Sequence, residues 1–171
     1  YSEDYHYARI FRGVSGAEWG LSMTADGLSG YGGLEASHLA VNVIRSRIED
    51  TLSSTRCDDV SELIKSAILE ANQKLDKPKR PVHTTLDLIL MRGNELYLAH
   101  LGDGRIYFGC GEELVQVTTD EESGGRPSNY LGAEYLHYDI YHLTIEERAH
   151  IVKISLDSPE YYAPLFTKGF I

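Results

Sequence analysis

The stretch Trp19-Gly-Leu-Ser-Met-Thr-Ala-Asp-Gly-Leu-Ser-Gly30 leads from an apolar run into a glycine-rich turn. The run before Asp26 has the composition of a buried strand, and a helix is expected from Glu35 onward. An aspartate at the end of a buried strand can supply oxygen ligands to a hard cation. Gly27 has no Cβ, so its carbonyl can turn toward the same ion. An ordinary strand–turn–helix connection also favours aspartate and glycine, so this stretch alone supports both interpretations.

A second stretch, His83-Thr-Thr-Leu-Asp-Leu-Ile-Leu-Met-Arg-Gly-Asn-Glu-Leu-Tyr-Leu-Ala-His-Leu-Gly-Asp-Gly-Arg-Ile-Tyr107, predicts two strands and the start of a third. The first two are joined by a turn at Gly93-Asn94, and the third follows Gly102-Asp-Gly104. Residues 84–118 together have the pattern of an antiparallel meander. Further strands are expected over 135–143 and 149–156, which alternate polar and apolar residues.

The N-terminal half predicts two strands and two helices. The strands fall within 5–25, separated by Gly13-Val-Ser-Gly16, and the helices cover 35–52 and 59–75, the second capped by Asp58 or Asp59. Apolar residues at helical spacing indicate that both helices bury one face in the core. Strands, then helices, then more strands indicate an α+β domain with largely antiparallel sheets.

The order of the motifs along the chain resembles the metal-dependent protein phosphatase 2C family, also called PPM. Its D-G-x-x-G turn, A-S near a helix start, T-T-L strand, G-D-S-R segment and L-x-Q-L-T-x-D segment have counterparts in order. These are Asp26–Gly30, Ala36-Ser37, Thr84-Thr-Leu86, Leu101-Gly-Asp-Gly-Arg105 and Leu114-Val-Gln-Val-Thr-Thr-Asp120. The resemblance implies a sandwich of two mainly antiparallel β-sheets flanked by helices.

The resemblance also implies a metal site. Asp26, the Gly27 carbonyl and Asp157 would bind Mn²⁺ or Mg²⁺, two ions or three in all, and a water bridging two ions would attack the phosphorus of phosphoserine or phosphothreonine in a protein. Asp103 would be a third-ion or outer ligand, although Asp-Gly is also a common turn pair. Carboxylate oxygens suit such hard ions, and two ions lower the pKa of a shared water.

Ser2-Glu3-Asp4 resembles the end of the family's R-x-x-N-E-D motif. In that case the carboxylates of Glu3 and Asp4 would order metal-bound waters. A frayed acidic terminus is the alternative explanation of the same residues.

Several positions depart from the family pattern. Tyr31 stands where many bacterial members have histidine, Gly104 replaces the serine of G-D-S-R, Ser158 replaces the glycine of S-D-G, and no Asp or Asn follows Asp157. A catalytically impaired phosphatase-like domain that acts as a regulatory or protein-binding module is therefore the alternative to an enzyme. A phosphatase of small phosphorylated molecules is a third possibility.

Composition limits the classes of protein to consider. The 171 residues suit one domain over 1–171, which we expect to be incomplete at both ends, and the net charge of −10 argues against nucleic acid or anionic membranes as partners. With only two cysteines, a reducing cytoplasm is expected. A phosphorylated protein substrate and a regulatory protein partner, in a signalling role, are the partners that the resemblance implies.

Other chemistry finds less support in the sequence. The seven histidines are scattered, and His137 and His142 are separated by an odd number of residues, which places them on opposite faces of a strand. None of the usual zinc-ligand spacings occurs. The chain also has no G-x-S-x-G segment of the kind that carries a nucleophilic serine.

Overall fold

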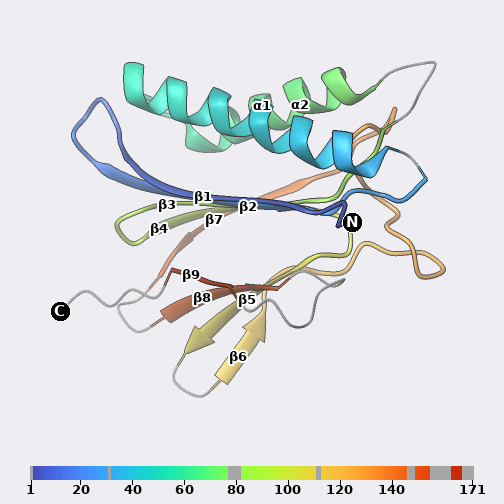
Figure 1. Ribbon diagram of the computed structural model, residues 1–171. Coiled ribbons are helices and arrows are strands. Elements are labelled where there is room, and N and C mark those ends of the chain that lie inside the picture. The colour runs from blue at the N-terminus through green and yellow to red at the C-terminus, as the bar shows by residue number, and fades with distance from the viewer. Residues whose placement is uncertain are drawn as a thin grey trace.

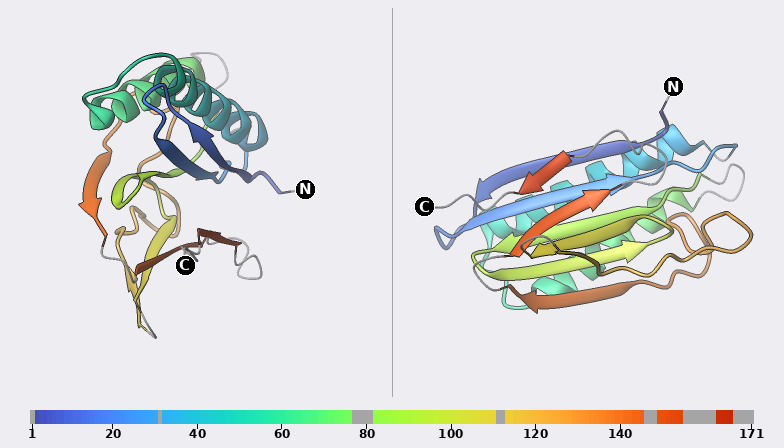
Figure 2. Two further views of the ribbon diagram at one scale, coloured as in Figure 1. Left: turned by 90° about the vertical axis from the view of Figure 1, so that its left-hand side faces the viewer. Right: turned by 90° about the horizontal axis from the view of Figure 1, so that it is seen from below.

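The computed structural model describes residues 2–30, 32–76, 82–110, 113–145, 149–154 and 163–166, which form three layers (Figure 1). A pair of helices covers one face of a five-stranded sheet, and a four-stranded sheet lies against its other face. Figure 2 shows the same layers from the side and from below. The predicted α+β sandwich of mainly antiparallel sheets is confirmed, with both described helices on the same outer face.

All strand pairs in both sheets are antiparallel. The larger sheet has the order β1 (Tyr5–Arg12), β2 (Glu18–Ala25), β3 (Leu86–Arg92), β4 (Glu95–Leu101), β7 (Asp139–Thr144). The smaller has the order β6 (Glu113–Gln116), β5 (Arg105–Cys110), β8 (Ala149–Ile154), β9 (Ala163–Phe166). The sequence pattern predicted each of these strands except β9.

The two helices are α1 (Gly33–Ser54) and α2 (Val60–Leu75). Asp59, one of the two predicted caps, accepts a hydrogen bond from the backbone N–H of Glu62 at 2.9 Å and begins α2. Neither helix combines the length and the apolar character needed to cross a membrane, among the residues described.

The central strands bury both faces. Leu86, Leu88 and Leu90 of β3 belong to the core cluster that includes both helices. Ile89, on the opposite face of the same strand, packs with Leu98 and other residues between the two sheets. Odd-numbered residues of β3 therefore face the second sheet, because side chains alternate along a strand.

The predicted meander over 84–118 is wrong in one respect: its strands belong to two sheets. β3 and β4 lie in the larger sheet, whereas β5 and β6 lie in the smaller one. The chain changes sheets at Gly102, which has φ of 110°, and its backbone N–H and C=O bond to Glu121 instead of continuing a ladder. Hydrophobic alternation is the same on either side of this turn, so it could not indicate the crossing.

The register brings several chain segments to one end of the sandwich. Tyr5 at the start of β1 lies opposite Ala25 at the end of β2, and Leu86 at the start of β3 lies opposite Leu101 at the end of β4. This end lies near the chain's N-terminus in Figure 1, as does the beginning of α1. The segments that carry the predicted metal ligands Asp26 and Asp103 therefore leave the sheets at the same end.

Two leucines on α2 test whether the helix–sheet core stabilises the domain. Leu63 is 6% exposed and packs in that core, whereas Leu69 is 38% exposed. We expect Leu63→Ala to lower the free energy of unfolding by about 2–4 kcal/mol, through lost burial and a residual cavity, and Leu69→Ala by less than about 1 kcal/mol. Urea unfolding of the two variants measures both values, and equal losses would contradict this assignment of the core.

Candidate metal centre

The backbone of Asp26 is held on both sides by two threonines. Its N–H donates to the Thr85 hydroxyl at 3.0 Å. Its carbonyl accepts from the Thr85 N–H at 2.9 Å and from the Thr84 hydroxyl at 2.8 Å. The threonines of the T-T-L segment thus fix the aspartate at the end of β2.

The glycines that follow Asp26 allow the turn to pack directly on α1. An ideal Cβ at Gly27 would lie 2.3 Å from the carbonyl carbon and oxygen of Gly33, and one at Gly33 would lie 2.4 Å from the carbonyl carbon of Gly27. No side chain fits between these two backbones. Glycine at both positions is therefore required by close approach, in addition to any role of the Gly27 carbonyl toward an ion.

The acidic N-terminal segment is not frayed but packs on this turn. The backbone carbonyl of Glu3 accepts from the Gly27 N–H at 3.3 Å and from the Ser37 hydroxyl at 2.7 Å, and the Glu3 carboxylate accepts from the Ser29 hydroxyl. Asp4 follows directly and precedes β1. The structure thus brings Glu3 and Asp4 to the turn that follows β2, while their role toward metal-bound water stays a prediction.

The turn that contains Asp103 also lies close to Asp26, through a contact between Gly102 and Thr85. An ideal Cβ at Gly102 would lie 2.7 Å from Cγ2 of Thr85, the residue that holds Asp26. Gly102 is fixed by Glu121, whose carboxylate accepts from its N–H at 3.0 Å and whose N–H donates to its carbonyl at 2.8 Å. Asp157, the remaining predicted ligand, lies outside the described residues, as do Tyr31 and Ser158.

The donor atoms gathered at this end fit Mn²⁺ or Mg²⁺ in kind. The segments carry carboxylates at Glu3, Asp4, Asp26 and Asp103, and such oxygens suit hard divalent ions. Within the described ranges, no three histidine, cysteine, aspartate or glutamate side chains come close enough together to hold an ion. Asp157 lies outside these ranges, so its part in the site, like that of the other ligands, stays a prediction.

A buried ion pair that the sequence analysis missed lies between the two sheets. Asp87 and His100 are 3% and 5% exposed, and the His100 Nδ1 lies 2.7 Å from a carboxylate oxygen of Asp87. His100 Nε2 lies 3.1 Å from the carbonyl oxygen of Thr119. Since that carbonyl can only accept, Nε2 carries a proton, and a further proton is shared between Nδ1 and the carboxylate. The available signal was an aspartate within an apolar strand, facing a histidine in the next one.

Burial and pairing act in opposite directions on His100. Burial by itself lowers the pKa of His100, but the hydrogen bond and negative charge of Asp87, together with the charge of Glu121 and the Thr119 carbonyl, raise the pKa above its ordinary value. The folded protein therefore holds the proton of His100 more tightly than the unfolded chain does.

A second histidine, His83, responds differently. Burial lowers the pKa of His83, and a hydrogen bond with the backbone of Gly132 opposes this effect only in part. Its ring lies against Tyr130, with 4.5 Å between ring centroids. The backbone carbonyl of His83 accepts from the Leu28 N–H at 3.0 Å, so this residue also borders the turn after β2.

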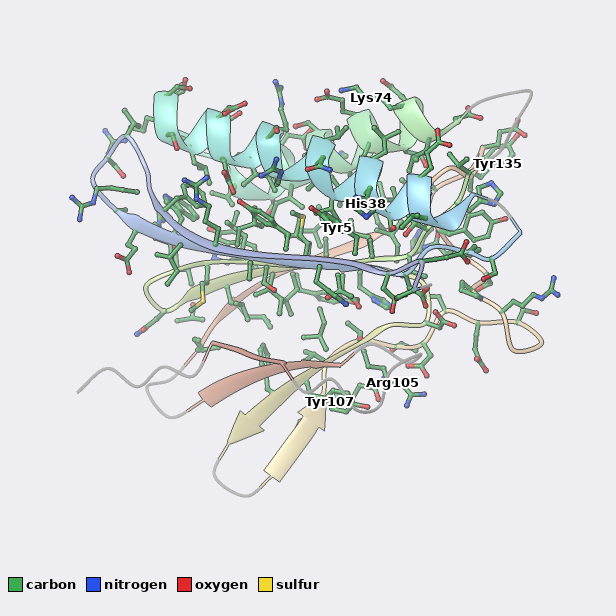
Figure 3. The ribbon with its side chains drawn as sticks, viewed as in Figure 1. Tyr5, His38, Lys74, Arg105, Tyr107 and Tyr135 are labelled. Atoms are coloured by element: carbon green, nitrogen blue, oxygen red, sulfur yellow. The ribbon has the colours of Figure 1, made fainter. Side chains whose placement is uncertain are left out.

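An ion pair between Arg105 and Asp120 holds the beginning of β5, which lies in the smaller sheet (Figure 3). Nε of Arg105 donates to both carboxylate oxygens of Asp120 at 2.9 Å, and this bonding lowers the pKa of Asp120. The G-D-x-R and T-x-D segments of the sequence are thereby joined next to the Asp103 turn.

The His100 pKa shift predicts how stability depends on pH. Because the folded-state pKa is raised, the stabilisation from the Asp87–His100 pair is fully present below the ordinary histidine pKa of about 6.5 and is lost as pH rises through the folded pKa. We expect the unfolding free energy of the wild type, relative to Asp87→Asn/His100→Gln, to fall between pH 6 and pH 9. Chemical unfolding at each pH measures this difference, and a constant or rising difference would contradict the shift.

The chain is similar in sequence to known protein phosphatases. Residues 2–145 match the family model for protein phosphatase 2C. Protein phosphatase PhpP of Streptococcus pneumoniae is 33% identical over 106 residues, which cover 58% of this chain and 43% of that protein. The chain thus matches less than half the length of this relative.

Solved structures show the same fold. A serine/threonine phosphatase of S. agalactiae superposes with a TM-score of 0.71 at 19% identity, covering 90% of this chain and 72% of that one. The catalytic domain of the phosphatase PstP, determined in complex with two manganese ions, gives a TM-score of 0.68 at 21% identity, covering 89% and 77%. The family model extends from the N-terminal acidic segment to the end of the larger sheet, and this chain belongs to the protein phosphatase 2C family.

Proposed function

We propose that this chain forms a metal-dependent phosphatase domain that hydrolyses phosphoserine or phosphothreonine in proteins. The observation that carries the proposal is the packing of three acidic segments at one end of the sandwich. Thr84 and Thr85 hold Asp26, Thr85 lies against Gly102 in the Asp103 turn, and Glu3-Asp4 packs on Gly27. A relative named as a protein phosphatase and a structural neighbour that contains two manganese ions support it.

In this proposal Asp26, the Gly27 carbonyl and Asp157 hold two Mn²⁺ or Mg²⁺ ions, Asp103 serves a third ion or the outer shell, and Glu3 and Asp4 order water. The bound ions would supply Lewis acidity, lowering the pKa of water and neutralising the charge on the phosphoryl oxygens. The reaction breaks the bond between phosphorus and the serine or threonine oxygen. Water is consumed, and inorganic phosphate and a free hydroxyl are formed.

The residues around the ligands have the task of keeping them in place. Thr84 and Thr85 fix both polar groups of the Asp26 backbone, so this part of the chain does not have to be ordered when an ion binds. Ser29 orients the Glu3 carboxylate. Such partners of metal ligands commonly change metal affinity by about 10- to 100-fold when they are removed.

Replacement of Asp26 by asparagine tests the proposal directly. Asp26→Asn keeps the shape of the side chain but removes its charge. We expect Mn²⁺-dependent hydrolysis of p-nitrophenyl phosphate and of a phosphothreonine peptide to fall by at least about 100-fold, because loss of a ligand should cost at least as much as loss of an outer partner. Hydrolysis is measured with and without Mn²⁺, and Mn²⁺ binding is measured by calorimetry.

Asp50→Asn on α1 is the matched control. Asp50 lies in a groove between the helices, with Arg47, Glu70 and Lys74 among its neighbours, in the last turns of α1, whereas the turn after β2 lies at the beginning of that helix. This variant should keep wild-type activity. A folded wild-type protein without turnover or Mn²⁺ binding would reject the catalytic proposal and favour the regulatory or protein-binding module.

A further inference from the structure

We propose that the buried Asp87–His100 pair is a positioning element, which sets the Gly102–Gly104 turn and through it the place of Asp103. Position 104 would have to be glycine because the Asp87 carboxylate occupies the space that a side chain there would need. The inference rests on the proposed function in one respect, namely that Asp103 serves the metal site. Its steric part stands on the packing alone.

The first step is the location of the pair. Asp87 and His100 are opposite each other in the register of β3 and β4, so their side chains lie on the same face of the sheet. That face is the one with Ile89 and Leu98, which points to the second sheet. The pair therefore occupies the end of the inter-sheet core, next to the point where the chain changes sheets.

The second step is the contact with Gly104. An ideal Cβ at Gly104 would lie 2.2 Å from Oδ2 and 3.0 Å from Cγ of Asp87. Gly104 does not have a positive φ, so its backbone conformation suits any residue. The need for glycine at this position thus comes from the Asp87 carboxylate and not from the turn itself.

The carboxylate cannot turn aside without cost. Asp87 is buried and its Oδ1 is engaged by His100, so rotation away from position 104 would break a buried, charge-assisted hydrogen bond. His100 is in turn held by the Thr119 carbonyl. The position of the pair is therefore determined from several sides.

The third step links the pair to the turn. The Thr118 hydroxyl lies 3.4 Å from the Gly104 carbonyl and accepts from the Ile106 N–H at 3.0 Å. Glu121 bonds both backbone groups of Gly102. Residues 118–121 therefore hold the turn at both ends, and His100 fixes this segment through Thr119.

The last step leads to the ligands. The turn rests on Thr85 through Gly102, and Thr85 holds the backbone of Asp26. A shift of the turn would displace Asp103 relative to Asp26. The pair thus acts on the metal centre through the backbone, without touching an ion.

The experiment combines substitutions at positions 87 and 104. Gly104→Ala is made in the wild type, in Asp87→Ala, which vacates the space, and in Asp87→Asn, which keeps the bulk but not the charge. We expect Gly104→Ala to raise the Mn²⁺ concentration for half-maximal activity by about tenfold in the wild type and in Asp87→Asn, but by less than about threefold in Asp87→Ala, within the coupling range of contacting residues. The unfolding free energies should show the same dependence on residue 87.

Gly27→Ala is the control for a steric change at the same end of the molecule. Gly27 contacts the backbone of Gly33, which Asp87 does not affect, so this substitution should be equally harmful with Asp or Ala at position 87. Equal damage from Gly104→Ala in all three backgrounds would overturn the inference.

Amide hydrogen exchange provides a readout that needs neither metal nor activity. In Asp87→Ala, the exchange rates of the Gly102 and Glu121 amides should rise at least about tenfold more than that of a core strand amide such as Leu21, whose change reports only the loss of global stability. Unchanged exchange at Gly102 would also overturn the inference. If the wild type binds no Mn²⁺, the proposed function fails, and the exchange and unfolding data alone then decide this inference.

Discussion

The direct contact between the backbones of Gly27 and Gly33 is the constraint on which the rest of the functional end depends. It sets the helix α1 against the turn that follows β2, at a distance that no side chain allows. Because α1 also packs on the larger sheet through its buried face, this contact fixes the turn relative to the whole core. The acidic N-terminal segment then packs on a surface whose shape is already determined, with Gly27 and Ser37 as its partners.

The two layers of apolar packing have different roles. The cluster under the helices is large and includes most of the fully buried side chains, so it supplies most of the hydrophobic stabilisation. The cluster between the sheets is small, and the Asp87–His100 pair lies at its end. A buried ion pair contributes less net stability than its attraction alone would, since desolvation offsets part of that attraction, but it demands one geometry of its surroundings. A pair with that property suits a position where a turn must be held in one place.

The same end of the molecule collects polar groups from segments far apart in the sequence. Thr84 and Thr85 bond to Asp26, which is nearly 60 residues away, and Glu121 bonds to Gly102, which precedes it by 19 residues. Each bond is to a backbone group, and such groups cannot move without moving the chain. The arrangement therefore fixes the backbone at Asp26 and at Gly102, which reduces the ordering that ligand binding at this end would require.

Local sequence patterns determined most of the elements of this protein. The apolar spacing of α1 and α2, the Asp59 cap, and the apolar runs and alternating segments of β1 to β8 follow from the preferences of neighbouring residues, and the structure confirms them. The order of the D-G, T-T-L and G-D-x-R segments was enough to indicate the family, since these motifs depend on residue type and order alone. The acidic residues at the candidate metal centre could be named for the same reason.

The tertiary structure decided what depends on register and close packing. Strand alternation is identical whether β5 continues the first sheet or begins a second one, so the crossing at Gly102 could not be predicted. Asp87 and His100 are 13 residues apart and become partners only through the pairing of β3 with β4. Gly104 has the place of a turn glycine in the sequence. Only the packing shows that it leaves room for a carboxylate, because that space is defined by another strand.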